Sequence, residues 1–447
     1  MKAIIMAGGK GSRIQSVRSD VPKPMIEICG KPILRYQIEN LRACGLRDIT
    51  IGVGHLGSVI KEYFGDGSEF GVNIDYFTED HPLGTAGALF KMLDGKNCRE
   101  IDTKTAIDDD FLLLCGDIIF DVDFNRFIDF HKKHNAWASL ASHPNGHPYD
   151  SSLLVTEILP PESEGGLPVH THRVVKWLAK EDERTWYRNL VNAGIEIISP
   201  ELLRKTARTF VPRHPETPDK IDLDRDVLKP NIESGKIFAY ETPEYIKDMG
   251  TPERYYETEA DIRSGKVSAR NLRSKQKAVF LDRDGTINKD CGFITDARNF
   301  ELLPEAAEAI KKINTSGYLA IVVTNQPVIA RGECTFEELE RIHNKMETEL
   351  GKKGAFIDAL YFCPHHPDKG FAGEKAAYKC ECACRKPKAG MLLQAAKDFN
   401  IDIASSYMIG DSEKDVLAGE KAGCKKSFLL DKNRNVLDCV SEIVNKE

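Results

Sequence analysis

A glycine-rich loop follows the first apolar run of the chain. The run Ala3–Ala7 leads directly into Gly8, Gly9, Lys10, Gly11, Ser12 and Arg13. Glycines permit a sharp turn that brings backbone N–H groups against phosphate oxygens, and an arginine adds a permanent positive charge. Lys23 stands between two prolines that restrict the backbone around it. The two segments indicate a site for a phosphorylated ligand, and the alternative is a plain turn with a solvated lysine nearby.

Two aspartates follow another apolar run well past the middle of the chain. Ala278–Leu281 is followed by Asp282, Arg283, Asp284, Gly285 and Thr286. A carboxylate at the end of a strand can attack a phosphorus atom. A second one, two residues later, can give a proton to the leaving oxygen and then take one from water. By their spacing alone, Asp282 and Asp284 are compatible with chemistry of this kind and with a simple Mg²⁺ site.

Cysteines and histidines crowd into one short stretch of the second half. Of the twelve cysteines, four lie between residues 363 and 384, together with two histidines. The pairs Cys363-x-His365 and Cys382-x-Cys384 supply three thiolates and one imidazole, a closed tetrahedral set of the kind that holds structural Zn²⁺. Cys380 is a further thiol that could replace Cys382, and reduced core cysteines are the alternative to a metal site.

These residues need β-strands that end beside one another. Apolar runs of strand length alternate with helix-length amphipathic stretches, and the clearest runs lie at 49–53, 112–114, 320–323 and 407–409. Such alternation favours βαβ units with a mainly parallel sheet. A polar, basic stretch separates the two series of runs. The chain is therefore expected to form two α/β domains, residues 1–262 and 277–447, joined by a linker at 263–276.

The charge of the chain argues against two classes of partner. Sixty-two basic and 69 acidic residues give a formal net charge of −7, whereas general nucleic-acid binders and proteins of anionic membrane surfaces carry basic surfaces. The apolar runs are far shorter than the roughly 20 residues of a membrane-spanning helix, and the first is too short for a signal peptide. We expect a cytoplasmic protein whose partners are small molecules, and the sequence leaves open whether it forms a homo-oligomer.

The first half resembles the sugar nucleotidyltransferase family. That family opens with G-G-x-G-[ST]-R followed by P-K-P, and four later segments of this chain agree with it in order: Pro82–Gly87, Gly116-Asp117, Asn192–Ile195 and Asp248–Pro252. The resemblance implies a Rossmann-like fold with a mixed sheet. It also implies that an oxygen of a sugar 1-phosphate attacks the α-phosphate of a nucleoside triphosphate and that pyrophosphate leaves. Positioning and charge neutralisation carry such a reaction, without a covalent intermediate.

The resemblance also assigns roles to individual residues of the first half. Asp117 and Asp248 would hold Mg²⁺, and Arg13 and Lys23 would be the catalytic cations that offset the charge of the triphosphate. Lys180 would contact the sugar phosphate, although Ala179 stands where the family usually has glutamate. The remaining residues expected to bind nucleotide or sugar are Gly8, Gly9, Gly11, Ser12, Gly84, Thr85, Gly87 and Asn192.

The second half resembles the haloacid-dehalogenase-type phosphatases. Their D-x-D-G-T pattern begins at Asp282, and Thr324-Asn325, Arg385-Lys386-Pro387 and Gly410-Asp411 follow in the family's order. The resemblance implies a Rossmann-like fold in which Asp282 is the nucleophile and Asp284 the general acid and base. Mg²⁺ would be held by Asp282, Asp411 and the backbone carbonyl of Asp284, and the substrate by Thr324, Asn325, Arg385 and Lys386. Asp415 is either a neighbour of this site or a charge on a helix surface.

The Cys/His pairs just before Arg385 resemble the zinc-containing heptose bisphosphate phosphatases, for which we expect a zinc loop and a minimal cap. Pro327 and Val328 stand where that family usually has Ser-Gly, so the preferred anomer stays open. Together the halves predict removal of the 7-phosphate of D-glycero-D-manno-heptose 1,7-bisphosphate. Transfer of GMP from GTP to heptose 1-phosphate would follow, giving GDP-heptose and pyrophosphate. The alternatives are another sugar or nucleotide, or a phosphatase with a regulatory nucleotidyltransferase-like domain.

Overall fold

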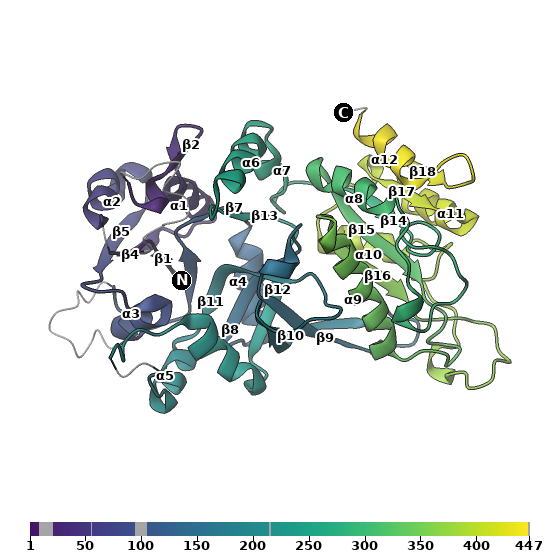
Figure 1. The fold of residues 1–447 in the computed structure, drawn as a ribbon, viewed down its shortest axis with the longest axis horizontal. Coiled ribbons are helices and arrows are strands. Elements are labelled where there is room, and N and C mark those ends of the chain that lie inside the picture. The colour runs from purple at the N-terminus through teal and green to yellow at the C-terminus, as the bar shows by residue number, and fades with distance from the viewer. Residues whose placement is uncertain (9–20, 55, 94–104, 214–215, 446–447) are drawn as a thin grey trace.

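Two α/β halves, each built on its own sheet, lie side by side along the long axis of the molecule (Figure 1). The structure is a computed structural model that describes residues 1–8, 21–54, 56–93, 105–213 and 216–445. The apolar runs that the sequence singles out form strands in both halves, so the predicted α/β class is confirmed.

The first half contains a nine-stranded mixed sheet. Its four-strand edge β5-β4-β1-β6 is parallel, and β11 joins β6 in the antiparallel direction. In spatial order the strands are β5 (Asn73–Thr78), β4 (Asp48–Val53), β1 (Lys2–Met6), β6 (Phe111–Cys115), β11 (Val191–Ile198), β8 (Ala138–His143), β12 (Ile237–Glu241), β10 (Val169–Leu178) and β9 (Leu153–Leu159). Two short ribbons accompany it: β13 (Tyr245–Asp248) with β7 (Ile118–Asp121), and β2 (Glu27–Ile28) with β3 (Lys31–Pro32).

Helices bury apolar side chains against both faces of this sheet. Alternate residues of β1 point to opposite sides, with Ala3 and Ile5 in one core and Ile4 in the other. The first core is covered by α1 (Ile33–Ala43), α2 (Gly57–Phe64) and α4 (Phe124–His134), and the second by α3 (Gly84–Leu93) and α5 (Pro200–Thr209). The helices α6 (Pro252–Arg263) and α7 (Lys266–Ala269) follow the last strand of this half.

The second half is a five-stranded parallel sheet between two helical layers. The order is β16 (Ala359–Cys363), β15 (Tyr318–Asn325), β14 (Lys277–Leu281), β17 (Tyr407–Gly410) and β18 (Lys426–Leu429). One face carries α8 (Ala306–Thr315), α9 (Phe336–Lys352) and α12 (Val436–Val444), and the other carries α10 (Gly390–Asp398) and α11 (Glu413–Ala422). Because β14 is central, its carboxyl end opens at the position where ligands bind in such sheets.

The connection between the halves is packed rather than free. The segment expected as a linker contains α7, and Arg270 donates to Asp358 across the boundary at 2.9 Å with both side chains buried. Further along the boundary, the backbone N–H of Asn189 donates to Glu347 at 2.8 Å and that of Tyr187 to Thr348 at 2.9 Å. These contacts bring α9 against the first half.

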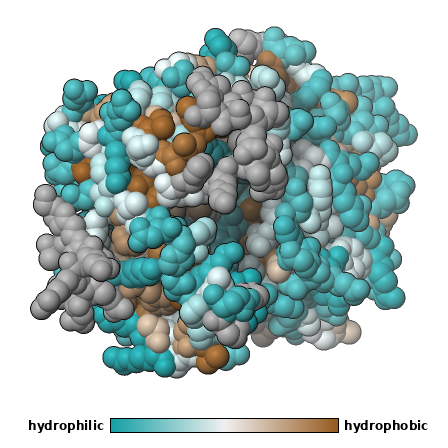
Figure 2. Space-filling model, turned by 60° about the vertical axis from the view of Figure 1, so that its left-hand side comes forward, coloured by the Kyte–Doolittle hydropathy of each residue, from teal (hydrophilic) through white to brown (hydrophobic). Residues whose placement is uncertain are grey.

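The outer surface is mainly hydrophilic on the face shown in Figure 2, where apolar residues are exposed in small groups. Within the described residues, no helix combines the length and apolar character that crossing a bilayer requires.

Candidate active sites

Strand pairing brings the two carboxylates of the first half together across 131 residues of sequence. Asp117 follows the end of β6, and Asp248 ends β13, where it lies opposite Ile118 in the β13–β7 ribbon. The backbone N–H of Met249 donates to the carbonyl of Asp117 at 2.9 Å. The structure therefore places Asp117 and Asp248 in one neighbourhood, and their role as ligands of Mg²⁺ stays a prediction.

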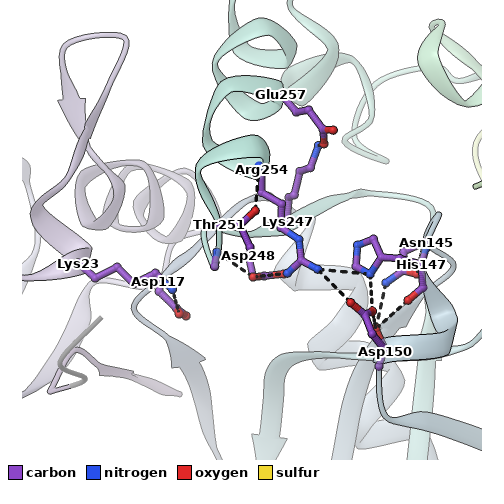
Figure 3. Close-up of polar contacts among 12 residues, drawn as sticks. Lys23, Asp117, Asn145, His147, Asp150, Lys247, Asp248, Thr251, Arg254 and Glu257 are labelled. Atoms are coloured by element: carbon purple, nitrogen blue, oxygen red, sulfur yellow. Dashed lines mark hydrogen bonds and ion pairs between the residues drawn. The ribbon is translucent and has the colours of Figure 1, made fainter. Parts of the chain in front are cut away.

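A basic side chain engages each of these carboxylates (Figure 3). Lys23 Nζ lies 2.5 Å from an oxygen of Asp117, and Arg254 Nη1 lies 2.6 and 2.7 Å from the two oxygens of Asp248. Burial opposes ionisation of Asp248, but the Arg254 guanidinium outweighs it and keeps the pKa of that carboxyl below its ordinary value. Asp248 thus keeps the charge that a divalent cation needs from a carboxylate ligand.

Arg254 is a residue of this site that the sequence alone did not reveal. It lies in the first turn of α6, which Thr251 caps by accepting from the backbone N–H of Arg254. The other nitrogen of its guanidinium faces His147 at 3.4 Å and Asp150 at 3.8 Å (Figure 3). Its position three residues after the Gly-Thr pair was the available signal.

The glycines of the first half permit close approach of one backbone segment to another. A Cβ on Gly116 would lie 2.9 Å from the carbonyl of Met6, so this glycine lets the Asp117 turn pack against the end of β1. A Cβ on Gly84 would lie 2.4 Å from the carbonyl oxygen of Ile221, and one on Gly87 would lie 2.2 Å from that of Asp219. That packing accounts for both glycines, and their approach to a nucleotide stays a prediction, as does the role of Thr85 beside them.

The remaining residues predicted to bind nucleotide or sugar lie at strand ends, on the surface or outside the described residues. Asn192 is at the start of β11, where its side-chain oxygen is buried and has no hydrogen-bond partner among the residues that the structure describes. Lys180 is a surface residue, 62% exposed, with Glu181 at 3.8 Å. Gly8 lies past the end of β1, whereas Gly9, Gly11, Ser12 and Arg13 lie outside the described residues.

In the second half, three carboxylates converge at the carboxyl ends of β14 and β17. Leu281 pairs with Ile409 in register, so Asp282 and Asp411 follow adjacent parallel strands. Together with Asp415 they place carboxylate oxygens within 4.8 Å of one another. A Cβ on Gly285 would lie 1.9 Å from Asp411, so glycine is required for this approach. The donor set is of the hard oxygen type that Mg²⁺ prefers.

Lys386 neutralises part of this cluster. Its Nζ lies 2.8 Å from Asp282 and 2.5 Å from Asp415, and all three side chains are largely or fully buried. The backbone of Lys386 is held in turn by Asn325, which accepts from its N–H and donates to its carbonyl, each at 3.0 Å. Burial raises the pKa of Asp282 to about 7, with the Lys386 charge acting in the opposite direction. Asp415 therefore belongs to the site and is not a charge on a helix surface.

Asp284 lies beside the carboxylate cluster of Asp282, Asp411 and Asp415, and its side chain is held by other partners. Its carboxylate accepts from Arg283 at 2.7 and 2.8 Å, from Asn288 at 3.0 Å and from Gln326 at 2.9 Å. Gln326 also donates to the buried hydroxyl of Thr324 at 2.9 Å. Burial opposes ionisation of Asp284, but the Arg283 charge outweighs it and lowers its pKa. Arg283 is thus a second residue whose contact the sequence did not indicate.

The predicted Cys/His set forms a compact buried cluster. Cys384 Sγ lies 3.2 Å from Cys363, 3.4 Å from Cys382 and 3.5 Å from His365 Nδ1. Cys363 Sγ lies 3.6 Å from both Cys382 and His365. Four donors at such spacing fit one tetrahedral Zn²⁺, and Cys380 is outside the set. Arg385 donates to the carbonyl of His365 at 3.0 Å, which links the Cys/His cluster to the loop that carries Arg385 and Lys386.

Comparisons with known proteins agree with this division. The nucleotidyl transferase family model matches residues 2–265, and a HAD-hydrolase-like model matches residues 383–435. The chain is 43% identical over 156 residues to the D-glycero-beta-D-manno-heptose-1,7-bisphosphate 7-phosphatase of Haemophilus ducreyi. The aligned region covers 35% of this chain and 83% of that protein. It is 40% identical to the corresponding alpha-heptose enzyme of Burkholderia mallei, over 35% of this chain and 80% of that protein.

Among solved structures, HddC from Yersinia pseudotuberculosis superposes with a TM-score of 0.44 and 24% identity, over 58% of this chain and 99% of that one. The family matches and the carboxylate sites of the two halves lead to the same conclusion. The chain belongs to the nucleotidyl transferase family through residues 2–265 and to the heptose-bisphosphate 7-phosphatase family through its second half, and it is an enzyme that combines a transferase with a phosphatase.

Proposed function

We propose that the enzyme converts a heptose 1,7-bisphosphate into a nucleotide-activated heptose in two consecutive reactions. The phosphatase domain, residues 277–447, removes the 7-phosphate, and the transferase domain, residues 1–262, transfers GMP from GTP to the remaining heptose 1-phosphate. The products are phosphate, pyrophosphate and GDP-heptose.

One observation carries this proposal: the product class of one site is the substrate class of the other. The Asp282–Lys386–Asp411 cluster suits hydrolysis of a phosphate monoester. The proteins related to this half are named heptose-1,7-bisphosphate 7-phosphatases, and removal of a 7-phosphate leaves the 1-phosphate in place. The Lys23–Asp117–Asp248 set suits nucleotidyl transfer to a sugar 1-phosphate. A single chain with both sites has a use for the intermediate.

In the phosphatase reaction, a carboxylate oxygen of Asp282 forms a bond to the phosphorus as the bond to O7 breaks, and Asp284 gives O7 its proton. Asp284 then takes a proton from the water that cleaves the aspartyl phosphate. Lys386 aligns Asp282. Asp282, Asp411 and the backbone carbonyl of Asp284 would hold Mg²⁺, which would neutralise the charge of the phosphate when bound. The Arg283 charge lowers the pKa of Asp284 and so favours the ionised form, which is the form that deprotonates water. The acid step uses the protonated form, so Asp284 takes up a proton before O7 leaves and regains one from the attacking water.

In the transferase reaction, Lys23 orients the triphosphate. The ion pair between Arg254 and Asp248 breaks as the substrates bind, which frees the Asp248 carboxylate. Asp117 and Asp248 would hold Mg²⁺, which supplies neutralisation of the triphosphate charge. Asn192, whose side-chain oxygen is buried and unpartnered, accepts a hydroxyl of the sugar. The reaction is direct: the 1-phosphate oxygen bonds to the α-phosphorus and the bond to pyrophosphate breaks.

The anomer is not fixed by similarity, because relatives that act on the beta and the alpha bisphosphate are 43% and 40% identical to this chain. Guanine rests on the resemblance of the first half alone. Zn²⁺ at Cys363, His365, Cys382 and Cys384 would shape the loop that carries Arg385 and Lys386, beside a minimal cap, and would take no part in bond changes.

The test is incubation of the purified enzyme with the alpha or beta bisphosphate and each of ATP, GTP, CTP and UTP, followed by ³¹P NMR. We expect loss of the 7-phosphate signal first and then formation of a diphosphate-linked sugar with GTP. Release of phosphate without a nucleotide sugar from any triphosphate would contradict the transferase half.

A further inference from the structure

A cavity that neither reaction uses lies at the boundary between the halves. Its volume is about 330 Å³, and the first half contributes Trp186 while the second contributes Thr295, Asp296, Arg298, Glu338 and Arg341. Figure 1 shows α9, which carries Glu338 and Arg341, next to the first half. Its size lies at the lower end of the range of small-molecule sites, about 300–1,000 Å³.

Trp186 offers an anchored aromatic side chain to this cavity. The next residue, Tyr187, donates its backbone N–H to Thr348 of α9 at 2.9 Å and accepts from the hydroxyl of Thr348 at 3.1 Å. The indole ring lies beside two cations, with Arg341 Cζ 5.7 Å and Lys345 Nζ 5.4 Å from its centroid. A flat surface next to positive charge is suited to an aromatic anion.

The charges around the cavity leave an excess of cation. Arg298 is paired with Asp296, and Glu338 accepts from the backbone N–H of Thr335 at 2.7 Å in the capping box of α9. Three basic side chains, Arg298, Arg341 and Lys345, lie around the cavity against two acidic ones, Asp296 and Glu338, which leaves a net charge of +1. A guanidinium is the group that most often binds phosphate in a bidentate manner.

We propose that this cavity binds a nucleoside diphosphate, with the base against Trp186 and the phosphates on Arg341. The choice of ligand rests on the proposed function, because such an enzyme consumes a nucleoside triphosphate and releases a diphosphate-linked sugar.

A ligand at this position would reach the phosphatase through residues 289–301. That segment leaves and rejoins the domain at one place, where Lys289 donates to the carbonyl of Glu301 at 3.0 Å and Leu303 to that of Ile287 at 2.9 Å. Asn288, at its base, donates to Asp284 at 3.0 Å. Residues 295–298 line the cavity at the far end of the segment. Occupation of the cavity would therefore restrain residues 289–301, which adjoin Asn288 and through it the predicted general acid Asp284.

The experiment is equilibrium dialysis of the full-length enzyme with GDP. We expect two GDP per chain in the wild type, one in Arg341→Gln and one in Lys23→Met, which lacks the transferase cation. Lys352→Gln, at the far end of α9, is the matched control and keeps two. Trp186→Leu should weaken the cavity site about tenfold, and inorganic pyrophosphate should displace GDP from it at least tenfold less well than GMP does.

The outcomes separate this inference from the proposed function. One GDP in the wild type that survives Arg341→Gln and is lost in Lys23→Met would overturn the cavity site and leave the transferase site intact. One GDP lost in Arg341→Gln and kept in Lys23→Met would support the cavity and contradict nucleotide binding at the transferase site. Pyrophosphate as effective as GMP would show a plain anion site and would overturn the nucleoside assignment.

Discussion

Lys386 is the residue on which the charge balance of the phosphatase site depends. Its side chain is 2% exposed and meets Asp282 and Asp415 at 2.8 and 2.5 Å. A buried carboxylate without a partner is costly, so loss of this lysine leaves two of them uncompensated. Burial then favours protonation of Asp282, which removes the nucleophile.

We therefore expect Lys386→Met to lower kcat for phosphate release by at least ~100-fold, with nucleotidyl transfer to supplied sugar 1-phosphate unchanged. Lys388→Met is the matched control, because Lys388 lies two residues away and pairs with Glu381 at the surface. Steady-state rates of both reactions in both variants check the expectation. Equal phosphatase rates in the two variants would show that Lys386 is not needed to keep Asp282 ionised.

At the scale of elements, the connection between β9 and β10 covers the Cys/His cluster of the other half. Gly165 has φ of +74°, its carbonyl lies 3.9 Å from Cys384 Sγ, and Leu167 packs into the core that contains Cys363 and Cys382. A Cβ on Gly165 would lie 3.2 Å from the carbonyl of Glu381 and 3.3 Å from Cys382 Cβ. The first half thus shields the candidate zinc site from solvent.

Gly165→Ala should consequently speed the release of zinc to a chelator by roughly tenfold, because the left-handed backbone and the close contacts together cost about 1–2 kcal/mol. Gly166→Ala, whose Cβ would lie 3.0 and 3.2 Å from atoms of Ser163 in the same loop and not against the Cys/His cluster, should release zinc at the wild-type rate. Chelator absorbance gives both rates. Zinc contents below about one per chain in the wild type, or equal rates in the variants, would refute the shielded site.

At the scale of the whole molecule, the boundary between the halves buries an acid. Glu347 of α9 is 8% exposed and accepts from the backbone N–H of Asn189 at 2.8 Å. Burial raises its pKa to about 7, with Arg188 acting in the opposite direction. The folded chain therefore binds a proton here that the unfolded chain releases near pH 4.5.

Because the folded pKa is the higher one, stability is lost as pH rises from about 4.5 to about 7. Glu347→Gln keeps an acceptor for Asn189 and removes the cost of ionisation, on the order of 1–3 kcal/mol at pH 8. We expect its melting temperature to exceed that of the wild type at pH 8 and the difference to shrink toward pH 5. Glu349→Gln, two residues away and paired with Lys352, should show no such trend.

The extent to which the sequence predicted this molecule differs between short and long range. Motifs such as Asp282-x-Asp284 and Cys382-x-Cys384 indicate their chemistry by themselves, and Asp282 follows a strand whose parallel pairing follows from the βαβ pattern. Arg254 and Lys386 act through partners that are distant in sequence and that tertiary packing selects, so their contacts were not readable from spacing. The packed boundary was likewise missed, because a polar, basic stretch is also what a free linker contains.

The most direct test of the central claim, that one chain carries two separate phosphorus chemistries, is a reciprocal pair of variants assayed for both reactions. Asp282→Asn should abolish phosphate release from heptose 1,7-bisphosphate and leave pyrophosphate release with supplied heptose 1-phosphate and GTP at the wild-type rate. Asp117→Ala should do the reverse. Loss of both activities in either variant, or normal pyrophosphate release from Asp117→Ala, would contradict the account.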